Sequence, residues 1–157
     1  MVENKYCSLY VNNMHLIVML IPYIENELEN EIVTILEDGL RDEIDTFISK
    51  VNLGKIKKKK LRNINWDKCL LSNEQIGEIH GKTILVKGNY CFIKNVNKII
   101  CDDNRVINCF MMDEFEENSR EILENHGSIL NTMGVKKISE MFQMNKLMNG
   151  KKIMRNG

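Results

Sequence analysis

The stretch ILVKGNYCFI, residues 84–93, decides how this chain folds, because Gly88-Asn89 separates its two apolar halves. Gly-Asn between two such runs is typical of the tight turn of a β-hairpin. It is also typical of the loop at the carboxyl end of a buried parallel strand, where open α/β sheets place their ligand sites. The rest of the sequence favours one of these two interpretations.

Apolar runs along the chain predict the strands of a parallel sheet. Residues 32–36 (IVTIL) and 83–86 (TILV) are apolar or β-branched at consecutive positions, which predicts central strands buried on both faces. The other predicted strands are 5–11, a weaker strand near an edge at 57–66, 104–112, and an antiparallel pair at 128–132 and 135–138.

Helical signals alternate with these strands. Asn12-Asn13 offer an N-cap for a helix over residues 14–29, in which Pro22 should kink the axis without ending the helix. The other predicted helices run from Asp38-Gly39 to Gly54, over 72–79, and from Asp113 to Asn125, with Glu116 completing a capping box. This alternation predicts a three-layer α/β domain with a mainly parallel central sheet. On that fold, Gly88-Asn89 is the loop at the carboxyl end of a central strand.

The length of the chain indicates one domain, and its balanced charges indicate that the whole domain has no net electrostatic field. The chain has 157 residues, 43% of them apolar, which predicts a single domain over 1–140 followed by a basic, flexible tail over 141–157. Its 22 acidic and 22 basic side chains cancel, so nothing draws the whole chain to nucleic acid or membrane. The basic segment 55–68 is interpreted as a solvated loop or strand edge, with nucleic-acid contact as the alternative.

Cysteine usage and the missing leader predict a cytoplasmic protein. The five cysteines include no C-x-x-C pair, which argues against a disulfide framework and a zinc knuckle. The apolar run 14–24 is too short to span a bilayer, and no cationic leader precedes a cleavage site. Reduced thiols and no membrane contact are therefore expected.

The motifs of common catalytic and nucleotide-binding sites are missing from the sequence. It contains no G-x-x-x-x-G-K-[ST], no G-x-G-x-x-G, no G-x-S-x-G and no H-E-x-x-H. His15, His80 and His126 lie far apart without a carboxylate motif, which favours structural roles. A Cys-His nucleophilic pair assembled from distant segments is the alternative. We therefore expect a non-enzymatic protein without cofactor or metal.

The predicted topology gathers aromatic and amide side chains at the carboxyl edge of the sheet. The segments expected there are Tyr10–Asn13, Glu37-Asp38, Trp66, Asn89-Tyr90 and Met112-Asp113. Such side chains suit a small, weakly polar organic ligand better than a phosphate or a sugar. The alternative is that Tyr10, Trp66 and Tyr90 cap the core.

Several of these stretches resemble the MEDS domain, a sensory domain first described in methanogen proteins and in the dichloromethane-responsive regulator of methylotrophs. Residues 6–31 (YCSLYVNNMHLIVMLIPYIENELENE) are similar to its opening strand and helix, with Cys7 and Tyr10 on a pattern H-I-C-x-x-Y. ILVKGNYCFI resembles the pattern R-V-x-G-N-x-x-W, which places Gly88 and Asn89 on its Gly-Asn. VINCFMMDEF (106–115) places Cys109 on the family's strand cysteine, and ENHGSIL (124–130) places His126 on its helix-ending histidine.

The resemblance implies a degenerate RecA-like fold without a P-loop and a role in signal transduction. The domain is then expected to bind a small hydrocarbon-derivative-like ligand, a protein partner of a signalling pathway, or both. The alternatives are a structural protein-interaction module with a dead pocket, and a nucleic-acid-binding regulator that uses residues 55–68. The helix after the Gly-Asn loop is expected to be cut to NVNKIICDD (95–103). The candidate ligand-binding residues are Cys7, Tyr10, Asn12, Trp66, Gly88, Asn89, Tyr90, Cys109 and His126.

Overall fold

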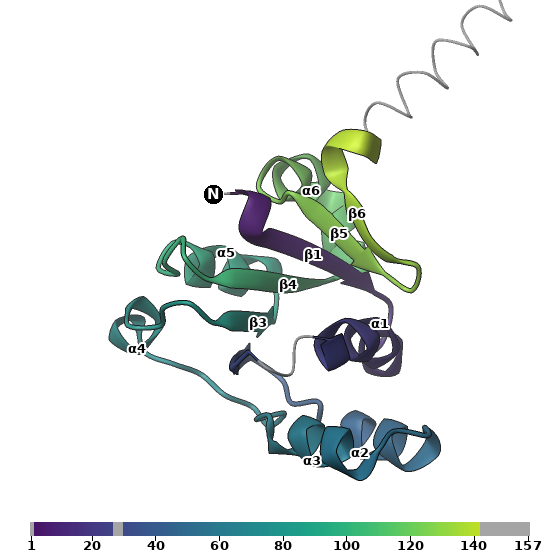
Figure 1. The fold of residues 1–157 in the computed structure, drawn as a ribbon. Coiled ribbons are helices and arrows are strands. Elements are labelled where there is room, and N and C mark those ends of the chain that lie inside the picture. The colour runs from purple at the N-terminus through teal and green to yellow at the C-terminus, as the bar shows by residue number, and fades with distance from the viewer. Residues whose placement is uncertain (1, 27–29, 142–157) are drawn as a thin grey trace, which may run out of the picture.

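A mostly parallel sheet of six strands forms the centre of the computed structural model, which describes residues 2–26 and 30–141 (Figure 1). The strands are β1 (Lys5–Tyr10), β2 (Ile32–Leu36), β3 (Thr83–Lys87), β4 (Arg105–Met111), β5 (Ser128–Asn131) and β6 (Gly134–Lys137). Their order across the sheet is β2-β3-β4-β1-β5-β6, and only the β5–β6 pair is antiparallel.

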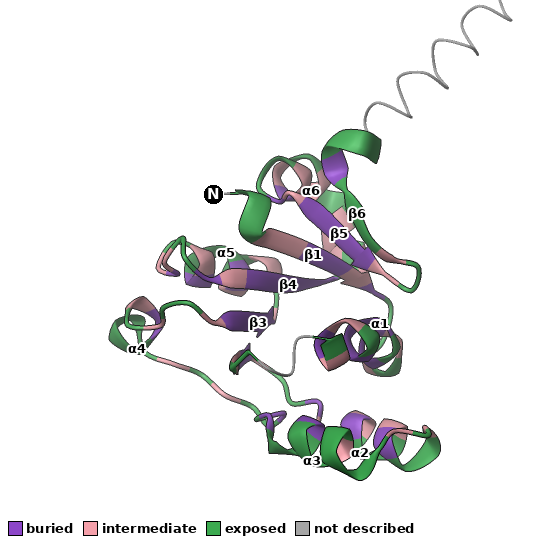
Figure 2. Cartoon of the chain, viewed as in Figure 1, coloured by how far each residue is buried: buried purple, intermediate pink, exposed green. Residues whose placement is uncertain are grey.

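Helices cover both faces of this sheet, which gives the predicted three layers. The helices are the short 3-10 helix η1 (Val2–Asn4), α1 (Asn13–Asn26), α2 (Arg41–Lys50), α3 (Lys55–Asn63), α4 (Asn73–Gly77), α5 (Tyr90–Asn97) and α6 (Met112–Glu124). One apolar core lies between the sheet and α1, α2 and α3, and a second lies between the sheet and α4, α5 and α6. Figure 2 shows the buried residues concentrated on the strands, as expected of a sheet covered on both sides.

The stretch 84–93 is a parallel strand followed by a helix. β3 pairs in parallel with β2 on one side and β4 on the other, so it is the predicted central strand and not half of a hairpin. The chain then enters α5, whose N-cap is Asn89: its side-chain oxygen accepts a hydrogen bond from the Phe92 backbone N–H at 2.8 Å. Gly88 is needed for close approach, since a Cβ there would lie 2.3 Å from Phe92 Cδ1.

α5 was not predicted, and the expectation that the helix after the Gly-Asn loop starts only at residue 95 is wrong. YCFIKNVN contains aromatic and β-branched residues, which favour strands when they are taken alone. Two signals override that preference: the Asn89 cap, and a buried face made by Ile93 and Val96 at helical spacing.

The predicted edge strand at 57–66 is also wrong, because residues 55–63 form α3. Lysine, arginine and leucine lose little side-chain freedom in a helix, and the lysines of this segment can remain in solvent there. Leu61 is the buried residue of α3. The Trp66 indole Nε1–H donates to the Leu61 carbonyl at 2.7 Å, which satisfies one carbonyl at the end of the helix.

The predicted central position of β2 is a third correction, since β2 lies at the edge of the sheet. The segment that follows α3 covers the free side of β2. Leu36 and Cys69 exchange two backbone hydrogen bonds of 2.8 and 2.9 Å, and the Thr34 hydroxyl donates to the Asn65 carbonyl at 2.6 Å. These contacts cover the edge of β2, whereas its two faces are buried because Leu36 and Ile35 lie in the two opposite cores.

The remaining elements agree with the sequence, apart from one helix cap. α1 continues through Pro22, and β5 and β6 pair around Met133-Gly134 as predicted. α6 begins after Met111 without a side-chain cap, so the capping box predicted at Asp113 is not formed. Within residues 2–26 and 30–141, no helix is long and apolar enough to cross a membrane. The tail predicted over 141–157 lies outside the described residues from position 142 onward.

Asn89→Ala should lower the free energy of unfolding by about 1 kcal/mol, because it removes the side-chain cap of α5. Urea denaturation measures this loss. The matched control is Asn95→Ala, an exposed position inside the same helix, where alanine should be neutral or slightly stabilising. Equal effects of the two substitutions would mean that the Asn89 cap does not stabilise the domain.

Candidate ligand-binding site

The carboxyl edge of the parallel strands is closely packed. β1 and β4 end together at Tyr10 and Met111, and β2 and β3 end together at Leu36 and Lys87. Tyr10 is buried, and the Lys87 side chain, in a residue only 3% exposed, places its Nζ 5.9 Å from the centre of the Tyr10 ring. Tyr10 is therefore part of the core, as in the alternative interpretation of this residue, and Lys87 contacts its ring.

Four of the candidate ligand-binding residues contribute to the two cores or cap a helix. Cys7 and Cys109 belong to the two opposite cores, and Trp66 is fully buried in the core that contains Cys109. Burial raises the pKa of the Cys7 thiol to about 12 and raises that of Cys109 as well, so both thiols remain protonated. Asn12 caps α1 by accepting a hydrogen bond from the His15 N–H at 2.8 Å.

A cavity of about 320 Å³ lies on the face of the sheet that α5 and α6 cover. It is lined by these two helices and by residues of β1 and β4. Its wall is mostly apolar and consists of Tyr90, Ile93, Phe110 and Ile122. Its rim is charged and carries three lysines and one carboxylate: Lys5, Lys94, Lys98 and Glu121. Of the nine candidate residues, the structure brings Tyr90 and His126 together here.

Three polar residues of the cavity form a hydrogen-bonded network that the sequence did not predict. Asn97 on α5 and Asn108 on β4 exchange two amide hydrogen bonds of 2.8 and 3.0 Å. Asn108 Nδ2–H also donates to His126 Nε2 at 2.9 Å, and His126 Nδ1–H donates to the Ile122 carbonyl at 2.6 Å. The second hydrogen of the Asn97 amide goes to the Ile93 carbonyl at 2.8 Å. Every side-chain N–H of the three residues is therefore used, whereas each amide oxygen keeps accepting capacity.

Burial fixes the charge state of this network. His126 is nearly buried, its ring meets Phe110 edge-on at 5.5 Å, and burial lowers the pKa of its imidazole to about 4. Burial, with the hydrogen bond and charge of Glu121, raises the pKa of Tyr90 to about 12. Lys94 and Glu121 form a 2.8 Å ion pair across the rim, which raises the pKa of Lys94 and lowers that of Glu121. At neutral pH the imidazole is therefore neutral and the ion pair is charged.

Among residues 2–26 and 30–141, the His, Cys and Asp side chains that can hold a metal ion lie elsewhere, where β3 and β4 begin. They belong to His80, Cys101 and Asp103. The cavity residues offer no comparable combination, because the His126 ring nitrogens are already engaged in hydrogen bonds.

Comparison with known protein families, with curated proteins and with solved structures finds no match for this chain. The geometry of the cavity is therefore the basis for a functional assignment.

The free energy of unfolding should fall by about 2 kcal/mol between neutral pH and about pH 5 because of His126 alone. The unfolded imidazole, with its ordinary pKa of 6.5, binds a proton in this range, whereas the folded one does not until about pH 4. Stability is thus complete above about pH 6.5 and is lost as the pH falls toward 4. Urea denaturation at both pH values measures the loss. His126→Gln should reduce this loss of unfolding free energy. An unchanged pH dependence in that variant would contradict the assignment of the loss to His126.

Proposed function

We propose that this chain is a regulatory domain that binds a small organic ligand in the cavity between α5 and α6 and does not convert it. The observation that carries the proposal is the combination of an apolar wall, a polar network whose N–H groups are all bonded, and a charged rim in a cavity of about 320 Å³. Small-molecule sites typically have this size and this mixture of apolar surface with a few fixed polar groups.

The lining supports a ligand with three chemical features. An apolar body fits against Ile93, Phe110 and Ile122. A hydroxyl or amine donor suits the network, because the Asn97 and Asn108 oxygens can still accept a hydrogen bond. An anionic group suits the rim, where three ammonium groups face one carboxylate.

Binding without chemical conversion is supported by the charge states. An efficient general acid or base has a pKa near the working pH. In the cavity, burial holds the pKa of His126 at about 4, and the pKa of Tyr90 is about 12. Neither group is suited to exchanging protons with a ligand at neutral pH.

A regulatory role is supported by the way the wall is built. α6 contains a break in its helical geometry at Asn118, so the segment that carries Glu121 and Ile122 is joined to the first turns of α6 through a non-helical residue. The Lys94–Glu121 ion pair connects this segment to α5. A ligand that inserts between the two helices acts on both, and the resulting movement is a signal that a protein partner can recognise. The resemblance to the MEDS domain supports the same role, and membership of that family stays a prediction.

Contact with nucleic acid through α3 is a second candidate function. α3 exposes several basic side chains, including Lys59, Lys60 and Arg62. Its field is weakened by neighbouring acids, since Lys57 pairs with Glu25 at 2.6 Å and α3 packs beside the acidic helix α2. An affinity for duplex DNA that fell steeply with salt would favour this candidate over the cavity.

The ligand proposal is tested with 8-anilinonaphthalene-1-sulfonate, a fluorescent probe with an apolar body and one anionic group. We expect saturable binding of one probe per chain. Lys98→Glu should weaken it roughly fivefold or more by reversing a rim charge, and Asn125→Trp should block the mouth of the cavity. The matched control is Lys59→Glu, the same charge reversal on α3, which should leave the affinity unchanged. Equal affinities in all four proteins, or no saturable binding, would overturn the proposal.

A further inference from the structure

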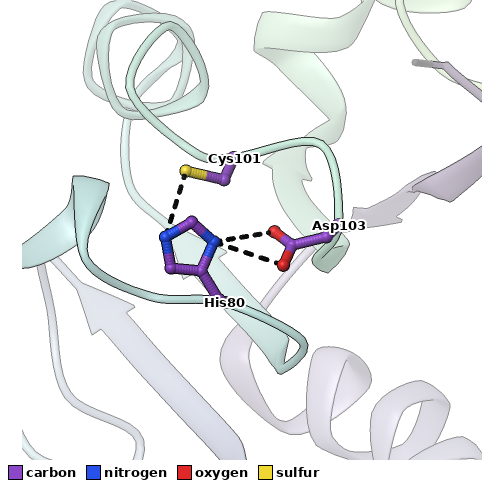
Figure 3. Close-up of side chains that lie close together, drawn as sticks. All are labelled: His80, Cys101 and Asp103. Atoms are coloured by element: carbon purple, nitrogen blue, oxygen red, sulfur yellow. Dashed lines mark hydrogen bonds and ion pairs between the residues drawn. The ribbon is translucent and has the colours of Figure 1, made fainter.

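A second polar cluster lies at the edge of the sheet where β3 and β4 begin, far along the strands from Gly88. His80 comes just before β3, whereas Cys101 and Asp103 lie in the connection between α5 and β4 (Figure 3). Asn104, which is 1% exposed, holds the two segments together. Its amide donates to the Ile79 and Cys101 carbonyls at 2.8 and 3.2 Å, and its oxygen accepts from the Lys82 N–H at 2.9 Å.

The His80 ring lies between the other two side chains of the cluster. Its Nδ1 is 3.2 and 3.3 Å from the two carboxylate oxygens of Asp103, and its Nε2 is 4.0 Å from Cys101 Sγ (Figure 3). One ligand atom from each residue lies within 4.8 Å of the others. The side chains of His80 and Asp103 are 62% and 52% exposed, so an ion in solution can reach them.

We propose that Cys101 Sγ and His80 Nε2 bind one divalent transition-metal ion of the Zn²⁺ and Co²⁺ class, and that Asp103 orients the imidazole. A thiolate and an imidazole select such ions, whereas Mg²⁺ and Ca²⁺ prefer oxygen ligands. The Nδ1–H···carboxylate contact is the arrangement that metal-bound histidines usually have, since it fixes the ring and its tautomer. Water completes the coordination on the exposed side.

The distances require only a small adjustment. Zn²⁺ lies about 2.3 Å from sulfur and about 2.0 Å from nitrogen, which places the two ligand atoms about 3.5 Å apart at a tetrahedral angle. The present separation of 4.0 Å closes to this value by rotation of the exposed imidazole. The thiol proton, now donated to the Gly77 carbonyl at 3.3 Å, is released when the ion binds.

The competing interpretation is a nucleophilic thiol activated by His80 and Asp103, because the three groups stand in the order of a catalytic triad. The contacts of the thiol favour the metal. Cys101 Sγ is 3.3 Å from the Gly77 carbonyl oxygen but 4.0 Å from His80 Nε2, so the carbonyl competes for the proton that the imidazole would have to accept.

Titration of the full chain with Co²⁺ in the presence of a phosphine reductant tests the proposal, because a thiolate ligand gives the cobalt complex a charge-transfer absorption band. We expect a band that saturates at one ion per chain and that Zn²⁺ abolishes by displacement. Cys101→Ser should remove the band, and His80→Gln should weaken binding about tenfold or more. Asp103→Asn should weaken it roughly tenfold to a hundredfold without removing the band, as expected for a residue that orients a ligand.

Two matched controls make the cobalt result specific. Cys91→Ser replaces a more exposed thiol and His15→Gln another histidine, and both should leave the titration unchanged. Urea midpoints show whether each variant is folded. A band that survives Cys101→Ser, or no thiolate band in the unsubstituted chain, overturns the proposal. Fast alkylation of Cys101 that depends on His80, without cobalt binding, overturns it in favour of a reactive thiol.

Discussion

β3 and β4 run parallel, and parallel neighbours cannot be joined by a tight turn, so the chain between them must cross over the sheet. Residues 88–104 make that crossover. Its first part is α5, which supplies Tyr90, Ile93 and Asn97 to the cavity. Its last part returns to the start of β4 and carries Cys101 and Asp103 to His80. Both candidate sites therefore depend on one strand pairing.

The sheet separates two cores of different character. The core under α1, α2 and α3 is filled by aliphatic side chains together with Tyr10 and Trp66. The core under α4, α5 and α6 borders the network of Asn97, Asn108 and His126. A buried polar group is tolerated only when its hydrogen bonds are satisfied. This explains why the network uses all of its N–H groups, and why its weakest member under acid conditions is the imidazole.

The sequence predicts those elements of the fold whose evidence is local. Apolar runs identify β2 and β3, and Ser72 with Gln75 forms a capping box that starts the predicted short helix. α3 and α5 were missed because a lysine run and an aromatic-rich stretch have ambiguous composition, and their burial depends on distant partners. The edge position of β2 was missed because the segment that contacts it through Cys69 carries no strand pattern.

The candidate sites were predictable only in part, for a related reason. Tyr90 and His126 could be named, but Asn108 is a single amide in the apolar run VINCF, and its partner Asn97 is on a separate helix. The signal that was available was the amide itself, since a polar side chain inside a buried strand requires a partner. His80 meets Cys101 and Asp103 only because Asn104 holds two loops together, and no spacing rule encodes that contact.

The shortness of α5 has a thermodynamic consequence. Asn97 at its last turn contacts the cavity network, and the N–H groups of Ile99 and Ile100 bond back to the Val96 carbonyl just before Cys101. Only three residues separate Asn97 of the cavity network from Cys101 of the second candidate site in the chain. If the two sites are occupied together, linkage requires reciprocity: whatever factor the organic ligand applies to the affinity for the ion, the ion applies to the affinity for the ligand.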